Sequence, residues 1–143
     1  MAEAHCPTFI NADVIAAELS PSAPESVAAR AARIMVQRMR AAAQTGASFA
    51  FETTLANRGY AQSIRAWQRD GYYVSIWFLA LPSAELSIAR VAQRVRQGGH
   101  GIPDGVIRRR FAAGRANFEG IFRDLADDWV LYDNSGVSPI LLD

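Results

Sequence analysis

The 143-residue chain contains fifteen arginines and no lysine. This absence excludes one common phosphate-binding device. The glycine-rich loop that holds the β- and γ-phosphates of a nucleotide ends in Gly-Lys-Ser or Gly-Lys-Thr, and its lysine reaches those phosphates. No position of this sequence supplies that lysine. Whatever the chain does alone, it does without such a loop.

Other features are scarce as well. The single cysteine, Cys6, excludes an internal disulfide and fits a reducing cytoplasm, where we expect the protein to act. No apolar run approaches the roughly 18 residues of a membrane span, so no membrane partner is expected. The net charge of +1 disfavours nucleic acid as a partner. His100 has no second His or Cys at ligand spacing, and we expect no metal site built from these residues.

Apolar segments of strand type alternate with segments of helical periodicity along the chain. The expected strands cover residues 7–12, 48–52, 72–81 and 129–133, with a short edge strand at 139–142, and the expected helices cover 24–45, 58–70, 83–97 and 104–122. This alternation predicts an α/β sandwich around a parallel sheet, and the length of residues 1–143 fits a single domain. Segment 72–81 is almost continuously apolar, which is typical of a central strand covered on both faces. Trp67, Trp77 and Trp129 are expected in the core.

Polar side chains follow three of the expected strands. They are Asp13 after the first, Glu52 with Thr53 and Thr54 after the second, and Asp133 with Asn134 after the last. In open parallel sheets, ligands bind beyond the carboxyl ends of the strands. A carboxylate there can take a proton from a substrate hydroxyl or hold Mg²⁺. The alternative is that Asp13 and one of the threonines only cap the helices that follow.

A second group of candidate residues is basic. The segment from Arg90 to Arg115 contains one acid, Asp104, and seven arginines: Arg90, Arg94, Arg96, Arg108, Arg109, Arg110 and Arg115. Arginine forks match phosphate oxygens and stabilise the charge of a transferring phosphoryl group. The glycines within residues 98–101 would let residues 98–115 close as an arginine lid. The alternative is a solvated helix surface with salt bridges.

Four segments carry a resemblance to a known family. FINADVIAAELSP, SFAFETTL, RVAQRVRQGGHGIPDGVIRRRF and LYDNSG, in this order and spacing, resemble the zeta-toxin-type family of P-loop kinases. The resemblance runs from Phe9 to Gly136. It implies a three-layer P-loop-kinase-like sandwich and the transfer of a phosphoryl group from ATP, with Mg²⁺, to a small hydroxyl-bearing acceptor. The best-known toxins of this family act on UDP-N-acetylglucosamine.

The resemblance also implies roles for the candidate residues. Asp13 would be the base that activates the acceptor hydroxyl. Glu52, Thr53 and Thr54 would line the acceptor pocket. The arginines Arg94, Arg96, Arg108 and Arg109 lie in the segment that resembles the lid over the phosphates. Asp133 and Asn134 would lie near the nucleotide.

One part of the family pattern is missing from this sequence. In the family, a strand, the phosphate-binding loop and a helix precede the segment that matches FINAD, and that strand lies at the centre of the sheet. Here eight residues precede Phe9. We therefore expect an incomplete kinase that lacks the central strand and its loop, and that does not turn over ATP alone.

Two other functions remain open. The chain could be a non-catalytic relative that binds a partner, such as an antitoxin protein, or that pairs with another chain to complete its sheet. It could also bind RNA or DNA through the arginine segment, although the near-neutral charge and the lack of exposed aromatic residues beside the arginines disfavour this.

Overall fold

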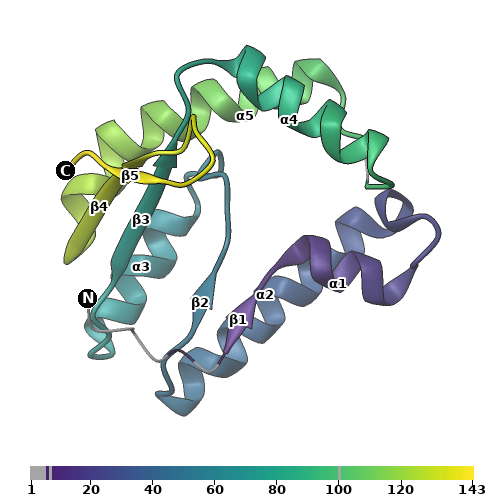
Figure 1. The fold of residues 1–143 in the computed structure, drawn as a ribbon. Coiled ribbons are helices and arrows are strands. Elements are labelled where there is room, and N and C mark those ends of the chain that lie inside the picture. The colour runs from purple at the N-terminus through teal and green to yellow at the C-terminus, as the bar shows by residue number, and fades with distance from the viewer. Residues whose placement is uncertain (1–5, 7, 100) are drawn as a thin grey trace. The chain divides into compact units, whose positions relative to one another are not determined.

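A computed structural model describes residue 6, residues 8–99 and residues 101–143 (Figure 1). Contacts between Cα atoms divide these residues into two compact units, one ending at Thr53 and the other running from Thr54 to Asp143. Helices and parallel strands occur in both units, which confirms the predicted α/β class. In the described part of the chain, no helix is long and apolar enough to cross a membrane.

The first unit joins two short strands to two helices. Strand β1 (Phe9–Ile10) runs parallel to β2 (Ala50–Phe51), and the connection between them contains α1 (Ala12–Leu19), the 3₁₀ turn η1 (Pro24–Val27) and α2 (Ala28–Thr45). Helix α2 buries Ala31, Met35 and Met39 at a spacing of four, which is one face of a helix. It ends at Gly46, whose φ of 72° is the left-handed conformation that glycine adopts without steric cost. The predicted helix from Pro24 to Gly46 is thus confirmed.

The predicted first strand, residues 7–12, is wrong in its extent. Strand β1 covers two residues, Pro7 lies outside the described residues, and a helix begins at Ala12. The cause is Asn11, whose side chain caps α1, so the chain turns directly from strand into helix. The sequence ADVIAAEL that follows is rich in good helix formers.

The second unit contains a three-stranded sheet with helices. Its elements are α3 (Tyr60–Arg69), β3 (Ser75–Ala80), α4 (Ala84–Arg96), α5 (Asp104–Asn117), the π-helical turn η2 (Phe118–Phe122), α6 (Arg123–Leu125), β4 (Asp128–Asp133) and β5 (Ile140–Leu141). Strands β3 and β4 are parallel, with Ser75 opposite Asp128. Strand β5 pairs antiparallel with the end of β4. The order of the sheet is β3-β4-β5.

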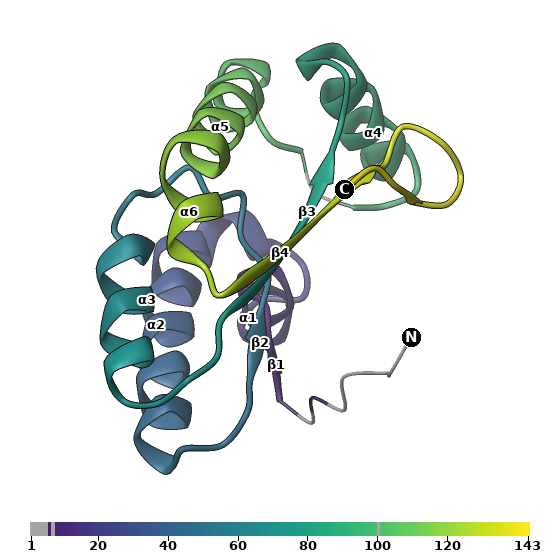
Figure 2. The same ribbon diagram turned by 90° about the vertical axis from the view of Figure 1, so that its left-hand side faces the viewer.

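The core of the second unit lies on one side of this sheet. Helices α3, α5 and α6 lie on the same side of β3 and β4 (Figure 2). Phe118 and Phe122 of η2 are almost fully buried there. The ring of Phe118 stacks on Phe78 at 4.4 Å between centroids and meets Trp129 edge-on at 5.8 Å. Trp67 and Trp129 pack against this cluster, which confirms two of the three tryptophans predicted in the core.

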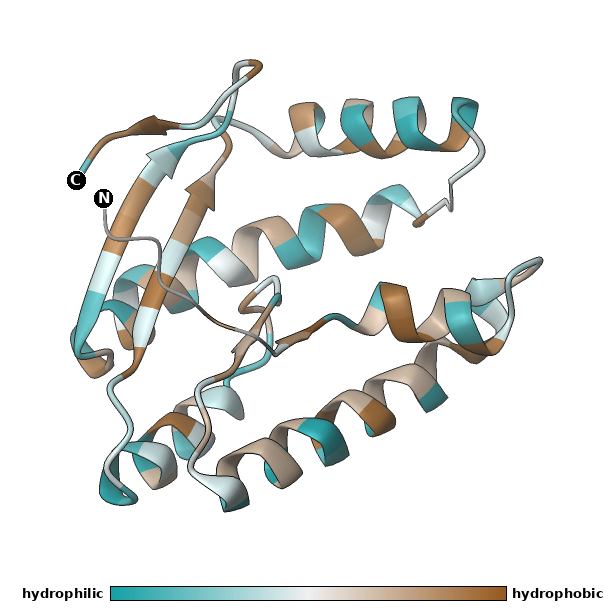
Figure 3. Ribbon diagram, turned by 60° about the horizontal axis from the view of Figure 1, so that its bottom comes forward, coloured by the Kyte–Doolittle hydropathy of each residue, from teal (hydrophilic) through white to brown (hydrophobic). Residues whose placement is uncertain are grey.

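The prediction that segment 72–81 is covered on both faces is wrong. Residues of β3 alternate in exposure: Ile76 and Phe78 pack against the core cluster, whereas Trp77 and Leu79 are 59% and 51% exposed. The placement of Trp77 in the core is therefore wrong as well. Figure 3 shows that β3 and β4 are largely hydrophobic. Composition alone could not separate a strand covered on both faces from one whose second face is open, because both are apolar.

Candidate functional site

The end of β1 and the end of β2 are joined by one polar side chain, Asn11. Its Oδ1 accepts hydrogen bonds from the backbone N–H of Asp13 (2.8 Å) and of Val14 (3.4 Å), and its Nδ2 donates to Oε2 of Glu52 (2.8 Å). Asn11 thereby holds the first turn of α1, which carries the exposed Asp13, beside the exposed carboxylate of Glu52. Both carboxylates stand at the carboxyl end of the parallel pair β1–β2, where the sequence predicted them.

The structure rules out the alternative that Asp13 and the threonines are helix caps. Asn11 is the N-cap of α1, and Asp13 lies in the first turn of the helix, two residues after the cap. Helix α3 begins only at Tyr60, with Gly59 as its N-cap. The Oγ1 of the exposed Thr54 accepts a hydrogen bond from the N–H of Ala56 at 3.4 Å, which closes a local turn. The role of these residues is therefore not helix capping.

Asp133 and Asn134 lie at the carboxyl end of β4, as predicted: Asp133 is its last residue and Asn134 follows it. The Oδ1 of Asp133 accepts a hydrogen bond from the N–H of Ser135 (2.9 Å), and the N–H of Asn134 donates to the carbonyl of Ala80 at the end of β3 (2.8 Å). Hydrogen bonds from Ser135, with a smaller contribution from the charge of Arg90, lower the pKa of the Asp133 carboxyl below its ordinary value. Nη2 of Arg90 donates to the carbonyl of Gly136 at 3.3 Å. A carboxylate and an arginine of the basic segment thus share this end of the sheet.

Among the predicted lid arginines, Arg108 has an acidic partner. Its Nη1 lies 2.6 Å from Oε1 of Glu85, so this ion pair joins the first turn of α4 to α5. The pair raises the pKa of Arg108 and lowers that of Glu85, chiefly through their hydrogen bond. Both side chains are more than half exposed, and such a pair contributes little to stability. In this structure Arg108 follows the alternative interpretation, a solvated surface with a salt bridge.

The other predicted lid residues are exposed. The side chains of Arg94 and Arg96 lie in the last turn of α4, and Arg109 follows Arg108 in α5. Gly98, with a φ of 92°, ends α4 in the left-handed conformation. His100 lies outside the described residues. No cluster of three His, Cys, Asp or Glu side chains suited to a metal occurs in the described part of the chain.

Sequence reasoning missed the residues that hold the segment after Thr53. Asn117 of α5 is 4% exposed and donates hydrogen bonds to the carbonyls of Leu55 and Ala56. No local pattern signals this contact, because 62 residues separate Asn117 from Leu55. Asn11 was also missed, although an asparagine directly before ADVIAAEL matches the N-cap preference and could have revealed both the cap and the helix.

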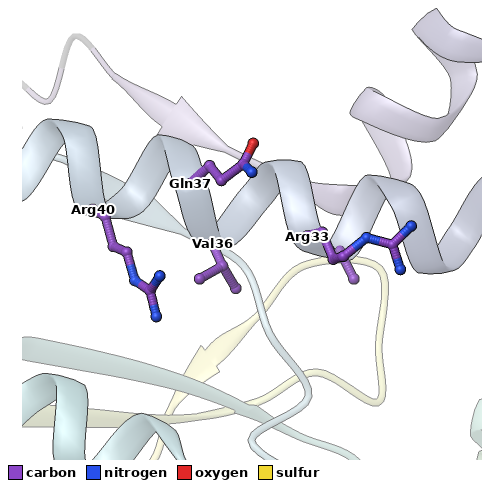
Figure 4. Close-up of a pocket in the computed structure, with 5 residues that line it drawn as sticks. Arg33, Val36, Gln37 and Arg40 are labelled. Atoms are coloured by element: carbon purple, nitrogen blue, oxygen red, sulfur yellow. The ribbon is translucent and has the colours of Figure 1, made fainter.

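A shallow hollow on the exposed face of α2 contains none of the predicted site residues (Figure 4). It is lined by Ala32, Arg33, Val36, Gln37 and Arg40. All five residues belong to one helix, so the hollow lacks the convergent polar groups from several elements that a small-molecule site requires. The carboxyl ends of the strands therefore remain the candidate site.

The fold and the candidate site define an α/β protein with carboxylates at the ends of parallel strands and arginines on the helices that follow. The zeta toxin family model matches residues 8–140, so the chain belongs to the zeta toxin family. Membership of this family indicates a kinase-like, ATP-dependent activity. An uncharacterized protein of Haemophilus influenzae is 26% identical over 102 residues, which span 71% of this chain and 73% of that protein. No solved structure matches the chain significantly.

Proposed function

We propose that this chain is the acceptor-binding part of an ATP-dependent phosphotransferase that acts on a small hydroxyl-bearing molecule. The observation that carries the proposal is the Asn11 bridge, which holds Asp13 and Glu52 at the carboxyl end of β1–β2. Family membership supplies the reaction class. In this proposal Asp13 is the base that would accept the proton of the acceptor hydroxyl, and Glu52, Thr53 and Thr54 would bind the acceptor.

The residues present do not form a complete site for MgATP. The chain has no lysine to reach the β- and γ-phosphates, and its described residues hold no three-ligand cluster for a metal. In this proposal the lysine-bearing loop is supplied from outside these 143 residues. Phosphate contacts are made by Arg94, Arg96, Arg108 and Arg109. Asp133 and Asn134 lie at the nucleotide end.

The unpaired edge and the exposed face of β3 support the proposal that a further segment completes the kinase. Strands β2 and β3 belong to different sheets, and within the described residues β3 has a strand partner only in β4. Trp77 and Leu79 leave one face of β3 exposed. An unpaired, apolar strand edge favours pairing with a further strand. A strand that joins β3, followed by a loop and a helix over Trp77, would complete a three-layer kinase sandwich in the cytoplasm, where ATP is available.

The test is to restore transfer. The chain is fused to a strand–loop–helix segment that ends its loop in Gly-Lys-Ser, and the transfer of ³²P from labelled ATP to a panel of sugar nucleotides and small alcohols is measured with Mg²⁺. The Asp13→Asn variant should lose about 10²–10⁴-fold in rate, because it cannot accept the proton. Glu18→Gln, an exposed acid on the same helix, is the matched control and should retain full activity. Equal rates for both variants would remove Asp13 from the catalytic role.

A second function is favoured by the same exposed face. Trp77 and Leu79, together with Leu141 at 58% exposure on β5, suit a non-catalytic module that binds a protein partner, such as an antitoxin. Under this alternative, the chain alone should be folded and should bind a cognate antitoxin with or without the fused segment. Under the kinase proposal, the fused segment itself should cover Trp77. The quenching of Trp77 fluorescence by acrylamide should then decrease.

A further inference from the structure

The loop that precedes α3 is held by a distant helix, α5. The Nδ2 of Asn117 donates to the carbonyl oxygens of Leu55 (2.8 Å) and Ala56 (3.2 Å). Its Oδ1 accepts a hydrogen bond from Nε of Arg58 at 3.3 Å. Asn117 is 4% exposed, so this one side chain pairs three groups of the loop in a place that excludes water.

A glycine of the same helix lets the loop approach closely. Gly114 is buried one turn before Asn117, and a Cβ at this position would overlap the carbonyl oxygen of Thr54. Any other residue would have to push Thr54 away from α5. Gly114 and Asn117 therefore act together: one permits the close approach, and the other pairs the carbonyl groups that follow Thr54.

The loop is also held in an unfavourable backbone conformation. Leu55 has a φ of 59°, which lies in the left-handed region, and it is a non-glycine residue with a buried side chain. This conformation costs of order 1 kcal/mol or more for a non-glycine residue and persists only where surrounding contacts over-determine it. The contacts here are the core cluster around Leu55, which includes Ile64 and Phe118, and the Asn117 hydrogen bonds.

We propose that Gly114 and Asn117 are positioning residues that set the place of the acceptor loop, residues 54–58, relative to the arginines of α5. This inference rests on the proposed function, in which Thr54 binds the acceptor. Arg108 and Arg109 lie on the same helix, within about two turns of Gly114. In this proposal helix α5 carries the phosphate-binding arginines at one end and holds the acceptor loop through Gly114 and Asn117 at the other. It thus sets the distance between the acceptor and the phosphate groups.

The first test uses the full chain and needs no ligand. Hydrogen exchange is followed by mass spectrometry in peptides that cover residues 54–59 and residues 75–80 for Asn117→Leu, which keeps the branching of the side chain at Cγ but loses all three hydrogen bonds. Exchange in 54–59 should rise at least about tenfold, while β3 stays protected, because a local opening leaves the core folded. Arg58→Met, which removes one of the three bonds, should give a smaller rise. No rise, or an equal rise in both peptides, would overturn the inference.

Gly114→Ala provides a second variant in case Asn117→Leu does not fold. It keeps every hydrogen-bonding group and displaces Thr54 by steric overlap alone, so it should also raise exchange in 54–59. Ala113→Ser, its half-buried neighbour on α5, is the control and should exchange like the parent chain. Unchanged exchange in the Gly114→Ala variant would show that the loop does not depend on α5.

The second test separates positioning from a purely structural role. In the fused, transferring enzyme, Asn117→Leu and Gly114→Ala should raise the KM for the acceptor about tenfold or more and leave the KM for ATP unchanged, since only the acceptor loop moves. Equal changes in both KM values, or none, would overturn the inference. Absence of transfer in the parent fusion would instead refute the proposed function, while the exchange experiment still decides whether α5 holds the loop.

Discussion

Asn11 shows how one side chain can serve both a helix and a candidate site. Its carbonyl oxygen pairs the first N–H groups of α1, which have no partner within the helix, and its amide orients Glu52. A serine or an aspartate would cap the helix equally well, but neither would donate to Glu52 in the same way. The choice of asparagine therefore follows from the carboxylate beside it, as well as from the helix.

Substitutions at Asn11 separate these two roles. We expect Asn11→Ala to lower the free energy of unfolding by about 1 kcal/mol through loss of the cap, and Asn11→Asp to retain most of it. In the fused enzyme, both variants should transfer more slowly, because both lose the donor to Glu52. Urea unfolding and initial rates measure the two effects. An Asn11→Asp variant with full activity would show that the contact to Glu52 is dispensable.

The low pKa of Asp133 predicts a pH dependence of stability. The folded pKa lies below the ordinary value of 3.8, so the ionised form stabilises the fold. This contribution is present above pH 3.8 and is lost as the pH falls through the folded pKa. Ser135→Ala removes the side-chain hydrogen bond and should move the pKa of Asp133 upward, as followed by NMR titration of its carboxyl carbon. An unchanged pKa would mean that the backbone N–H of Ser135 accounts for the whole effect.

At the scale of elements, η2 anchors the second unit. The π-helical turn places Phe118 and Phe122 in the core, at 2% and 0% exposure, directly after Asn117. The same stretch of helix therefore packs on β3 through its aromatic rings and holds the acceptor loop through its asparagine. π-helical turns occur frequently at functional sites, in agreement with this double role.

Phe122→Ala tests the anchor. The variant loses a fully buried ring, and we expect a loss of about 3–5 kcal/mol in the free energy of unfolding. Leu141→Ala removes a side chain that is 58% exposed and should cost less than about 1 kcal/mol, which makes it a matched control. Both are measured by urea denaturation monitored by circular dichroism. Similar losses for the two variants would contradict the burial of Phe122.

At the scale of the whole molecule, the low net charge and the exposed apolar surface of β3 favour association with another strand. A chain with a net charge of +1 has little electrostatic repulsion to keep copies apart, and its β3 strand, SIWFLA, contains no charged residue. Natural sheets protect their edges with charges, prolines or bulges, none of which occur within β3. This strand is therefore the part of the described chain best suited to pair with another strand.

Trp77→Arg tests whether the exposed face drives association. Because Trp77 is 59% exposed, the substitution should change the stability of the chain little but should weaken self-association and binding of a strand–loop–helix segment supplied as a separate peptide. Light scattering and titration of the peptide measure these effects. Arg69→Ala, at an exposed position of α3, serves as the control. Undiminished binding in the Trp77→Arg variant would mean that this face is not the docking surface.

Local patterns predicted most of the elements. The helix after Pro24 ends at Gly46, segment 129–133 forms the parallel strand β4, and the arginines lie on the helices where they were expected, whereas Asp13 lies in a helix, α1, that was not predicted. The contacts between distant residues could not be predicted in this way. The Asn117–Leu55 bond, the Glu85–Arg108 pair and the exposure of Trp77 each depend on which elements lie side by side.

The sequence by itself determined the α/β class, the family, and the absence of a phosphate-binding lysine, because periodicity, motif spacing and composition are properties of the chain. Only the tertiary structure decided that Asn11 joins Asp13 to Glu52, that Asn117 of α5 holds the loop after Thr54 by hydrogen bonds, and that one face of β3 is exposed. The physical reason is that hydrogen bonds and burial depend on the position of groups in space, and residues far apart in sequence become neighbours only after the chain folds.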